Sequence, residues 1–269
     1  MYDFDVVKPA TVAEAVSALG QDEAQPLSGG QTLIPVLKQG LAMPSGLIDL
    51  AGIEDLQGIT ATESTLTVGA MTTHARVAAS PEVQKAIPAL AGLAGGIGDP
   101  QVRNRGTLGG SLANNDPSAD YPASVLALSA VVVTDKRRIP ADGFFTGMFE
   151  TALDEGELIT DVEFPVAERA AYAKFPNPAS RYAVAGVFVA RVDGAVRVAV
   201  TGAGPGVFRA AEMEAALDKD FQADALEGIA VSEADLIADI HASAGYRAHL
   251  IGVMAGRAVD AANANVGAA

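Results

Sequence analysis

The amino-acid sequence predicts an α/β (α+β) protein made of two parts. The opening of the chain alternates strand and helix patterns, as a small α/β unit does. Two alternating apolar stretches at 183–190 and 195–201 flank Asp193-Gly194, a strong signal for a β-hairpin. The composition also changes near the end of the first part. We therefore expect one domain over residues 1–168 and a second over residues 169–269.

Helix-start and helix-stop signals support the α/β unit at the start of the chain. Thr11 with Glu14 three residues later forms a capping box, and Gly20 ends the helix. Pro35 stands in the first turn of a second helix, which Gly40 closes. In chain order, we expect an extended start at 4–8, a helix at 12–19, a strand at 25–27, a helix at 33–39 and a strand at 47–50.

The middle of the chain surrounds a long irregular segment with regular elements. Residues 95–120 are rich in Gly, Asn and Asp, and we expect them to form a loop. Long structured loops in compact domains are often functional. The other elements that we expect are a strand at 66–70, helices at 73–79 and 81–94, a helix at 119–128, a strand at 130–133, a short turn or helix at 144–148, a strand at 158–164, and helices near 208–217 and 246–262.

Charge and hydropathy exclude several classes of protein. The net charge is −15 and the pI about 4.5, so the surface repels nucleic acid and anionic membranes, and we expect neither as a partner. The first residues lack the basic start and apolar run of a secretory signal. The longest nearly apolar stretch, 121–133, is too short to cross a bilayer. We therefore expect a cytoplasmic protein without membrane insertion.

The chain contains no cysteine, which limits the redox chemistry that its own side chains can support. Disulfides, thiolate metal sites, a cysteine nucleophile and a cysteine-ligated iron–sulfur cluster are all excluded within this chain. Its histidines are His74, His241 and His249, and none has a second histidine at ligand spacing. We expect no metal site, and we favour a structural role for His74.

A first glycine loop, Ser28-Gly29-Gly30-Gln31-Thr32, lies between a predicted strand and a predicted helix. Paired glycines allow positive φ and let a ligand approach main-chain N–H groups. The following helix start adds free N–H donors and a partial positive charge, which together suit a pyrophosphate. Taken alone, the loop favours an ordinary tight turn.

A second glycine loop makes a ligand-binding role more favourable than an ordinary tight turn. It runs from Arg105 to Asp120 and contains Gly109-Gly110 beside hydroxyl and amide side chains. Two such loops in one domain suit a ligand with two phosphates and a polar, sugar-like chain. Asp120 has two equally supported interpretations: favourable placement at a helix start, or acceptance of hydrogen bonds from ligand hydroxyls.

With these loops in view, the sequence closely resembles the FAD-binding medium subunits of the molybdenum hydroxylases, of the carbon monoxide dehydrogenase and xanthine dehydrogenase family. The resemblance covers nearly the whole chain. Its motifs are Phe4-Asp-Val-Val-Lys-Pro, Ser28-Gly-Gly-Gln-Thr-Leu-Ile-Pro, Gly69-Ala-Met-Thr-Thr-His, the run from Asp99 to Asn114, Asp116-Pro-Ser-Ala-Asp-Tyr-Pro-Ala and Pro178-Ala-Ser-Arg-Tyr-Ala-Val-Ala-Gly.

The resemblance implies a fold and a set of cofactor-binding residues. The first domain would be a two-lobed FAD-binding domain of the vanillyl-alcohol-oxidase (PCMH) type, with lobes at about 1–55 and 56–168. The second would hold a small antiparallel sheet and helices. The FAD diphosphate would lie against Ser28, Gly29, Gly30, Gln31 and Thr32 and against Thr107, Leu108, Gly109, Gly110 and Ser111. Asp120 would contact the cofactor's polar chain or sugar, main chain near Ile97 and Ile159 would approach FAD, Lys174 would face it, and Tyr182 would cover the flavin ring.

One departure from the family pattern bears on how FAD is held. The family's first loop often reads Gly-Gly-His-Ser, whereas this chain has Gln31-Thr32. Covalent attachment in related flavoproteins uses a His or a Cys. This chain has no cysteine and no histidine in either glycine loop, so we expect non-covalent FAD.

The resemblance also implies a place in an electron-transfer chain. A large subunit would bind molybdopterin, a small subunit would carry two [2Fe-2S] clusters, and this chain would pass their electrons from FAD to a terminal acceptor. In such a hetero-oligomer we expect the chain alone to be inactive on substrate. Two alternatives stay open from the residues themselves. One is a stand-alone flavin oxidase or reductase, and the other is a non-catalytic interaction subunit with a decayed FAD site.

Overall fold

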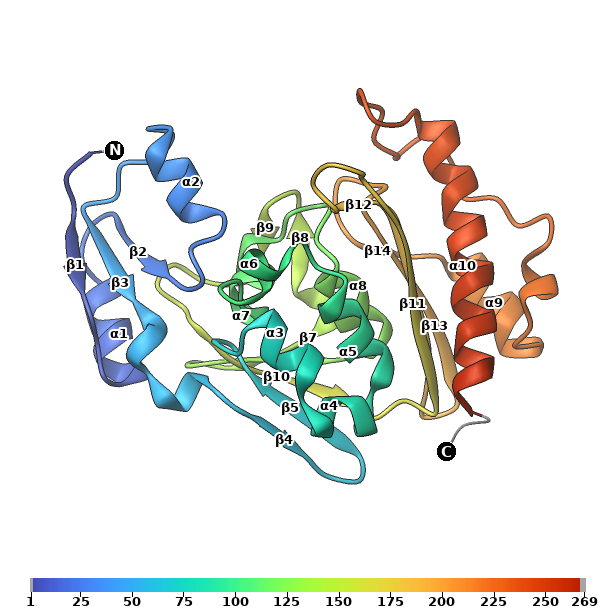
Figure 1. Cartoon of the computed structure of the whole chain (residues 1–269), viewed down its shortest axis with the longest axis horizontal. Helices are drawn as coiled ribbons and strands as arrows, with labels where there is room; N and C mark the ends of the chain where they lie inside the picture. Colours follow the sequence, from blue (N-terminus) through green and yellow to red (C-terminus); the bar gives the residue numbers. More distant parts are fainter. Residues whose placement is uncertain (1, 267–269) are drawn as a thin grey trace.

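The computed structural model describes residues 2–266 and confirms a mixed α/β fold. Three parts lie in a row: a small lobe at the N-terminus, a larger second lobe, and a sheet that carries the last helices (Figure 1). Each part has its own sheet and its own buried hydrophobic cluster.

The N-terminal lobe is a three-stranded parallel sheet in the order β1-β3-β2. Thr11 caps its first helix by accepting a hydrogen bond from the N–H of Glu14, as the capping box predicts. Two side chains of the second lobe, Met71 and Leu158, are buried within this lobe's hydrophobic cluster. Its elements are β1 (Asp5–Val7), α1 (Val12–Leu19), β2 (Ala24–Leu27), α2 (Leu33–Lys38) and β3 (Gly46–Asp49), followed by short 3-10 helices at Leu50–Gly52 and Glu54–Leu56.

The second lobe is a five-stranded antiparallel sheet with helices packed against it. The strand order is β4-β5-β10-β6-β7. Its strands are β4 (Ile59–Ala61), β5 (Thr65–Gly69), β6 (Val131–Thr134), β7 (Arg138–Pro140) and β10 (Ile159–Pro165), with the two-stranded hairpin β8 (Phe145–Gly147) and β9 (Glu150–Thr151) and a 3-10 helix at Ala141–Gly143. Its helices are α3 (His74–Ala79), α4 (Pro81–Ala86), α5 (Pro88–Gly95), α6 (Pro100–Arg103), α7 (Leu108–Asn114) and α8 (Tyr121–Ala127).

Three expectations for the second lobe were wrong in detail. The helix expected at 81–94 is two helices, because Pro88 excludes helical backbone at Ile87, which has φ −142°. The expected loop at 95–120 contains α6 and α7, whose first turns are capped by Asp99 and Thr107. The turn or helix expected at 144–148 is strand β8, paired with β9.

The last part is a four-stranded antiparallel sheet that is covered on both faces. Its order is β11-β12-β13-β14, and the predicted hairpin joins its central strands, with Asp193 and Gly194 at φ 50° and 77°. Helices α5 and α8 of the second lobe pack on one face, while α9 and α10 pack on the other (Figure 1). The elements are β11 (Arg169–Pro176), β12 (Ala183–Val192), β13 (Ala195–Thr201), β14 (Phe208–Arg209), α9 (Ala211–Lys219), a 3-10 helix (Ala223–Leu226) and α10 (Ala244–Val266).

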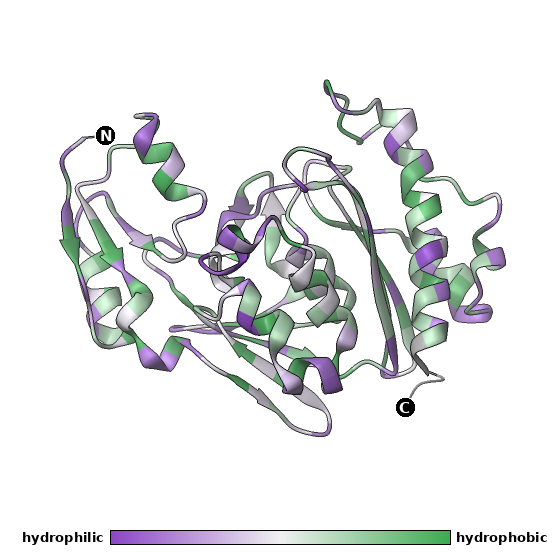
Figure 2. Cartoon of the chain, in the orientation of Figure 1, coloured by the Kyte–Doolittle hydropathy of each residue, from purple (hydrophilic) through white to green (hydrophobic). Residues whose placement is uncertain are grey.

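The side chains of strand β12 pack into the hydrophobic cores on both faces of this shared sheet. Phe188 belongs to the core of the second lobe, whereas Val187 and Val189 belong to the core beneath α9 and α10. The strand is therefore almost continuously hydrophobic instead of alternating between apolar and polar residues. Figure 2 shows the hydropathy of every residue in the orientation of Figure 1. Within residues 2–266, no helix is long and apolar enough to cross a membrane.

Replacing Phe188 with Ala should destabilise the fold strongly, because the ring is fully buried and stacks on Tyr172. We expect the free energy of unfolding to fall by about 3–5 kcal/mol. Urea unfolding followed by circular dichroism measures the change. The matched control is Ile240→Ala, at a side chain that is 96% exposed, where the change should stay within about 0.5 kcal/mol. Equal effects at both positions would contradict the shared-sheet assignment.

Candidate functional site

The two glycine loops meet across a cleft between the N-terminal and second lobes. The cleft has a volume of about 790 Å³, within the usual range of about 300–1,000 Å³ for ligand pockets. The hydroxyls of Ser28 and Thr107, one from each loop, are hydrogen-bonded at 2.6 Å. Loops that lie 79 residues apart in the sequence thus form one surface.

Steric crowding explains why this surface requires glycine. A Cβ atom on Gly29 would lie 2.2 Å from the carbonyl oxygen of Arg105, and one on Gly109 would lie 2.6 Å from the Cβ of Ala70. Gly30 has φ +70°, a conformation that side chains disfavour. A Cβ on Gly110 would lie 2.9 Å from the Thr107 hydroxyl. A side chain at any of these four glycine positions would therefore overlap neighbouring atoms or strain the backbone.

His74 supports the second loop from behind. The backbone N–H of His74 donates a hydrogen bond to the carbonyl of Gly106. A Cβ atom on Gly106 would lie 2.5 Å from Nε2 of the His74 imidazole. Burial, reinforced by the charge of Arg103, lowers the pKa of His74 to about 4, so the ring is neutral at neutral pH. The imidazole, Gly106 and Gly29 form a stack that fixes the spacing of the two loops. His74 therefore has a structural role, although it also lines the cleft.

The two loops differ in the hydrogen-bond donors that they leave free. Within the described chain, the backbone N–H groups of residues 29–32 have no hydrogen-bond partner. In the second loop, Gly109 donates to Ala70, and Gly110 and Ser111 donate to the hydroxyl and the carbonyl of Thr107. The first loop therefore offers main-chain donors to an anion, while the second contributes a close surface and the side chains of Thr107 and Ser111.

Asp120 lies on the cleft wall and is held from the opposite side by strand β11. Its carboxylate accepts a hydrogen bond from the Tyr172 hydroxyl and pairs with the Lys174 ammonium at 3.0 Å. Burial raises the pKa of Asp120, and the two partners oppose that shift by favouring the carboxylate. Asp120 is the N-cap residue of α8 but makes no capping bond. Both interpretations from the sequence stay open, because Asp120 stands at the start of α8 and also lines the cleft.

Most of the predicted site residues line this one cleft. They are Ser28, Gly29, Gly30, Gln31, Thr32, Ile97, Thr107, Gly109, Gly110, Ser111, Asp120, Ile159 and Tyr182. Leu108 is outside the lining because it is fully buried in the core of the second lobe. Lys174 lies behind Asp120, where it also donates to the carbonyls of Gly96 and Arg181. Tyr182 is 48% exposed at the rim.

The structure adds a wall of which the sequence indicated only the last residue, Ile159. Residues 151–159, between β9 and β10, line the cleft beside Met71 and His74. The wall includes the left-handed Gly156, at φ +69°, which is the one local signal that could have marked a tight turn there. Arg181 and Asp116 also line the cleft. These residues converge only through contacts between distant parts of the chain.

Other features of the molecule do not compete with this cleft. A second cavity, of about 730 Å³, lies between β8 and the start of α9 and includes neither glycine loop. Among residues 2–266, no group of three or more His, Cys, Asp or Glu side chains is arranged to hold a metal ion.

Comparison with protein families gives two adjacent matches. The family described as the FAD binding domain in molybdopterin dehydrogenase matches residues 2–167. The family described as the CO dehydrogenase flavoprotein C-terminal domain matches residues 170–262.

Known proteins match over almost their full lengths. The carbon monoxide dehydrogenase medium chain of Hydrogenophaga pseudoflava is 36% identical, with 96% of each chain covered. The nicotine 6-hydroxylase medium subunit of Paenarthrobacter nicotinovorans is 35% identical, covering 95% of this chain and 96% of that one. Among solved structures, carbon monoxide dehydrogenase from Hydrogenophaga pseudoflava superposes with a TM-score of 0.87, at 37% identity and 98% coverage of both chains. The chain therefore belongs to the FAD-binding medium subunits of the carbon monoxide dehydrogenase and xanthine dehydrogenase family, and it is an oxidoreductase subunit.

Proposed function

We propose that the cleft binds FAD without a covalent link and that the chain transfers electrons from [2Fe-2S] clusters on a partner subunit to a terminal acceptor. The convergence of the two glycine loops carries this proposal. The N–H groups of residues 29–32 have no partner within the described chain and belong to a glycine loop that lines the cleft, which suits a diphosphate that must approach the backbone closely.

The remaining lining fits the other parts of FAD. Asp120 is an acceptor, held by Tyr172 and Lys174, for hydroxyls of the cofactor's polar chain. Tyr182 offers a half-exposed aromatic face at the rim, where a flavin ring could be covered. We propose that Lys174 acts on the cofactor through Asp120 and the carbonyls that it binds. Intact loops and a cleft of sufficient volume argue against a decayed site.

The attachment of FAD follows from the chemistry of the lining. His74 is the one histidine among the cleft's described residues, and its ring is buried against Gly106. The chain has no cysteine. Neither residue type is therefore placed to form a bond with the cofactor.

The absence of cysteine also determines where the electrons must come from. FAD supplies the redox chemistry, while the protein binds it, orients it and sets its electrostatic surroundings. Clusters ligated by cysteine must be on another chain. The relatives are named as medium chains or subunits of carbon monoxide dehydrogenase and nicotine 6-hydroxylase, which supports a complex with a molybdopterin-binding large subunit and a [2Fe-2S] small subunit. A cytoplasmic location stays a prediction.

We expect acid precipitation of the purified protein to leave FAD in the supernatant, because the chain has no cysteine and the one histidine among the cleft's described residues is buried against Gly106. The measurement is the absorbance spectrum of the supernatant and of the pellet, with the released flavin identified by chromatography. Yellow colour retained by the denatured polypeptide would contradict non-covalent binding, and absence of any flavin would contradict the FAD assignment.

A complex isolated through a tag on this chain should contain iron and molybdenum in addition to FAD. The physical reason is that this chain has no thiolate to hold an iron–sulfur cluster, so its electron donor must be carried by partners. Elemental analysis together with separation of the subunits tests this. Substrate-dependent dye reduction by the chain alone, with no metal present, would instead establish a stand-alone flavoenzyme.

Substituting Gly30 or Gly110 with Asp should abolish FAD binding in the otherwise intact complex, since each change adds bulk and negative charge at the diphosphate surface. Flavin content per chain is the measurement, and circular dichroism monitors folding. The control is Gly143→Asp, at an exposed position where an added Cβ meets no described atom within 4 Å. Normal flavin content in the Gly30 and Gly110 variants would refute the role of the loops.

A further inference from the structure

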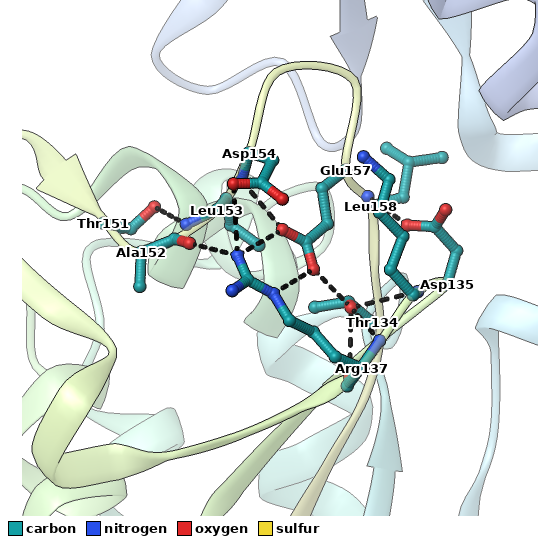
Figure 3. A network of polar contacts seen from close by, with 10 residues as sticks. Thr134, Asp135, Arg137, Thr151, Ala152, Leu153, Asp154, Glu157 and Leu158 are labelled. Atoms are coloured by element: carbon teal, nitrogen blue, oxygen red, sulfur yellow. Dashed lines mark hydrogen bonds and ion pairs between the residues drawn. The ribbon is translucent and has the colours of Figure 1, made fainter.

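One wall of the cleft, residues 151–159, is held by a polar network that lies outside the cofactor-binding loops. Figure 3 shows the network, which joins the β6–β7 hairpin to this wall. Arg137 donates to both carboxylate oxygens of Glu157, at 3.0 and 2.9 Å, and to the carbonyl of Ala152 at 2.6 Å. One guanidinium therefore contacts both ends of the wall.

Glu157 is at the centre of the network. Its side chain has no exposed surface, and it also accepts hydrogen bonds from the Thr134 hydroxyl at 2.6 Å and from the N–H of Asp154 at 2.7 Å. Hydrogen bonding to Arg137 lowers the pKa of Glu157 to about 2, so the carboxylate is ionised throughout the physiological range. If Arg137 were removed, Glu157 would be left as a buried charge without its partner, which destabilises a protein strongly. The wall would then have to rearrange so that water can reach the carboxylate.

The residue after Glu157 connects this network to the other lobe. The N–H of Leu158 donates to Asp135 at 2.7 Å, and its side chain is buried in the hydrophobic cluster of the N-terminal lobe. The neighbouring Ile159 is buried in the core of the second lobe. The wall is thus one of the places where the two lobes are in contact, and the cleft lies between them.

We propose that Arg137 is a positioning residue for the cofactor: through Glu157 it fixes the 151–159 wall and the insertion of Leu158, and so sets the separation of the lobes across the cleft. This inference rests on the proposed binding of FAD. We call the set Thr134, Asp135, Arg137 and Glu157 the Arg137 clamp. Among the described residues, Arg137 makes no hydrogen bond to either glycine loop. It therefore acts on the cleft through the wall.

The neighbouring residue provides a matched control. Arg138 also forms a bidentate ion pair. Its two terminal guanidinium nitrogens donate to the two carboxylate oxygens of Glu163, at 2.7 and 2.5 Å, across the sheet of the second lobe. Its side chain is 57% exposed, and neither Arg138 nor Glu163 lines the cleft. Adjacent arginines therefore form similar ion pairs, of which one reaches the cleft wall and the other does not.

The test compares Arg137→Ala, Arg137→Lys, Glu157→Gln and the control Arg138→Ala in the assembled complex. The first readout is the rate at which FAD is lost, followed by flavin content after gel filtration at intervals. We expect Arg137→Ala to lose FAD about tenfold faster or more, Arg137→Lys and Glu157→Gln to be intermediate, and Arg138→Ala to match the unsubstituted protein. The intermediate variants keep the test valid if Arg137→Ala does not fold.

The second readout is amide hydrogen exchange at Asp154, Glu157 and Leu158, measured on flavin-free protein so that loss of FAD does not contribute to the result. The amides of these residues should exchange faster in the Arg137 and Glu157 variants and at the normal rate in Arg138→Ala. Equal FAD loss from the Arg137 and Arg138 variants, or unchanged exchange in the wall, would overturn the positioning role. If the unsubstituted complex held no flavin, the proposed function would fail, while the exchange measurement would still decide whether the clamp orders the wall.

Discussion

The close packing of the two glycine loops is the constraint on which the rest of the site depends. Gly29 lies against the backbone of Arg105 and Gly106, and the Ser28 and Thr107 hydroxyls are joined there. The lobes can approach this closely because Gly29 has no side chain, since a Cβ atom there would overlap the carbonyl group of Arg105. The approach leaves the N–H groups of residues 29–32 free within the described chain. The cleft is consequently preorganised for an anion, and its other walls have to be placed relative to that contact.

Local signals in the sequence were enough to predict much of the fold. The cap that Thr11 makes to the N–H of Glu14 and the Asp193-Gly194 turn are formed as expected, although Glu14 accepts its return bond from Ala10 and not from Thr11. The helices α6 and α7 were missed although their cap residues, Asp99 and Thr107, were visible. Short helices in a glycine-rich stretch have low intrinsic propensity, and their stability comes from packing that the sequence does not display.

Long-range contacts set the limit on predicting the site. The sequence left two roles open for Asp120, and the partners that hold its carboxylate, Tyr172 and Lys174, are 52 and 54 residues away. The role that the resemblance implies for Lys174 stays a prediction, and the structure adds that its ammonium is bonded to Asp120 and to two carbonyls. The wall at 151–159 had no periodic pattern to reveal it before residue 158, where the predicted strand begins. Its shape depends on Arg137, a residue that reads in the sequence as an ordinary surface charge.

The two-faced burial of β12 has a consequence for biosynthesis. Ribosomes deliver a chain from its N-terminus, so α5 and α8 are made before the strands that cover them. Until Phe188 and its neighbours emerge, the nascent second lobe exposes an apolar helical face that invites aggregation or chaperone capture. Asp120 likewise has to wait for Lys174 on β11. The Asp120 side of the cleft is therefore complete only when the C-terminal sheet has closed over the second lobe.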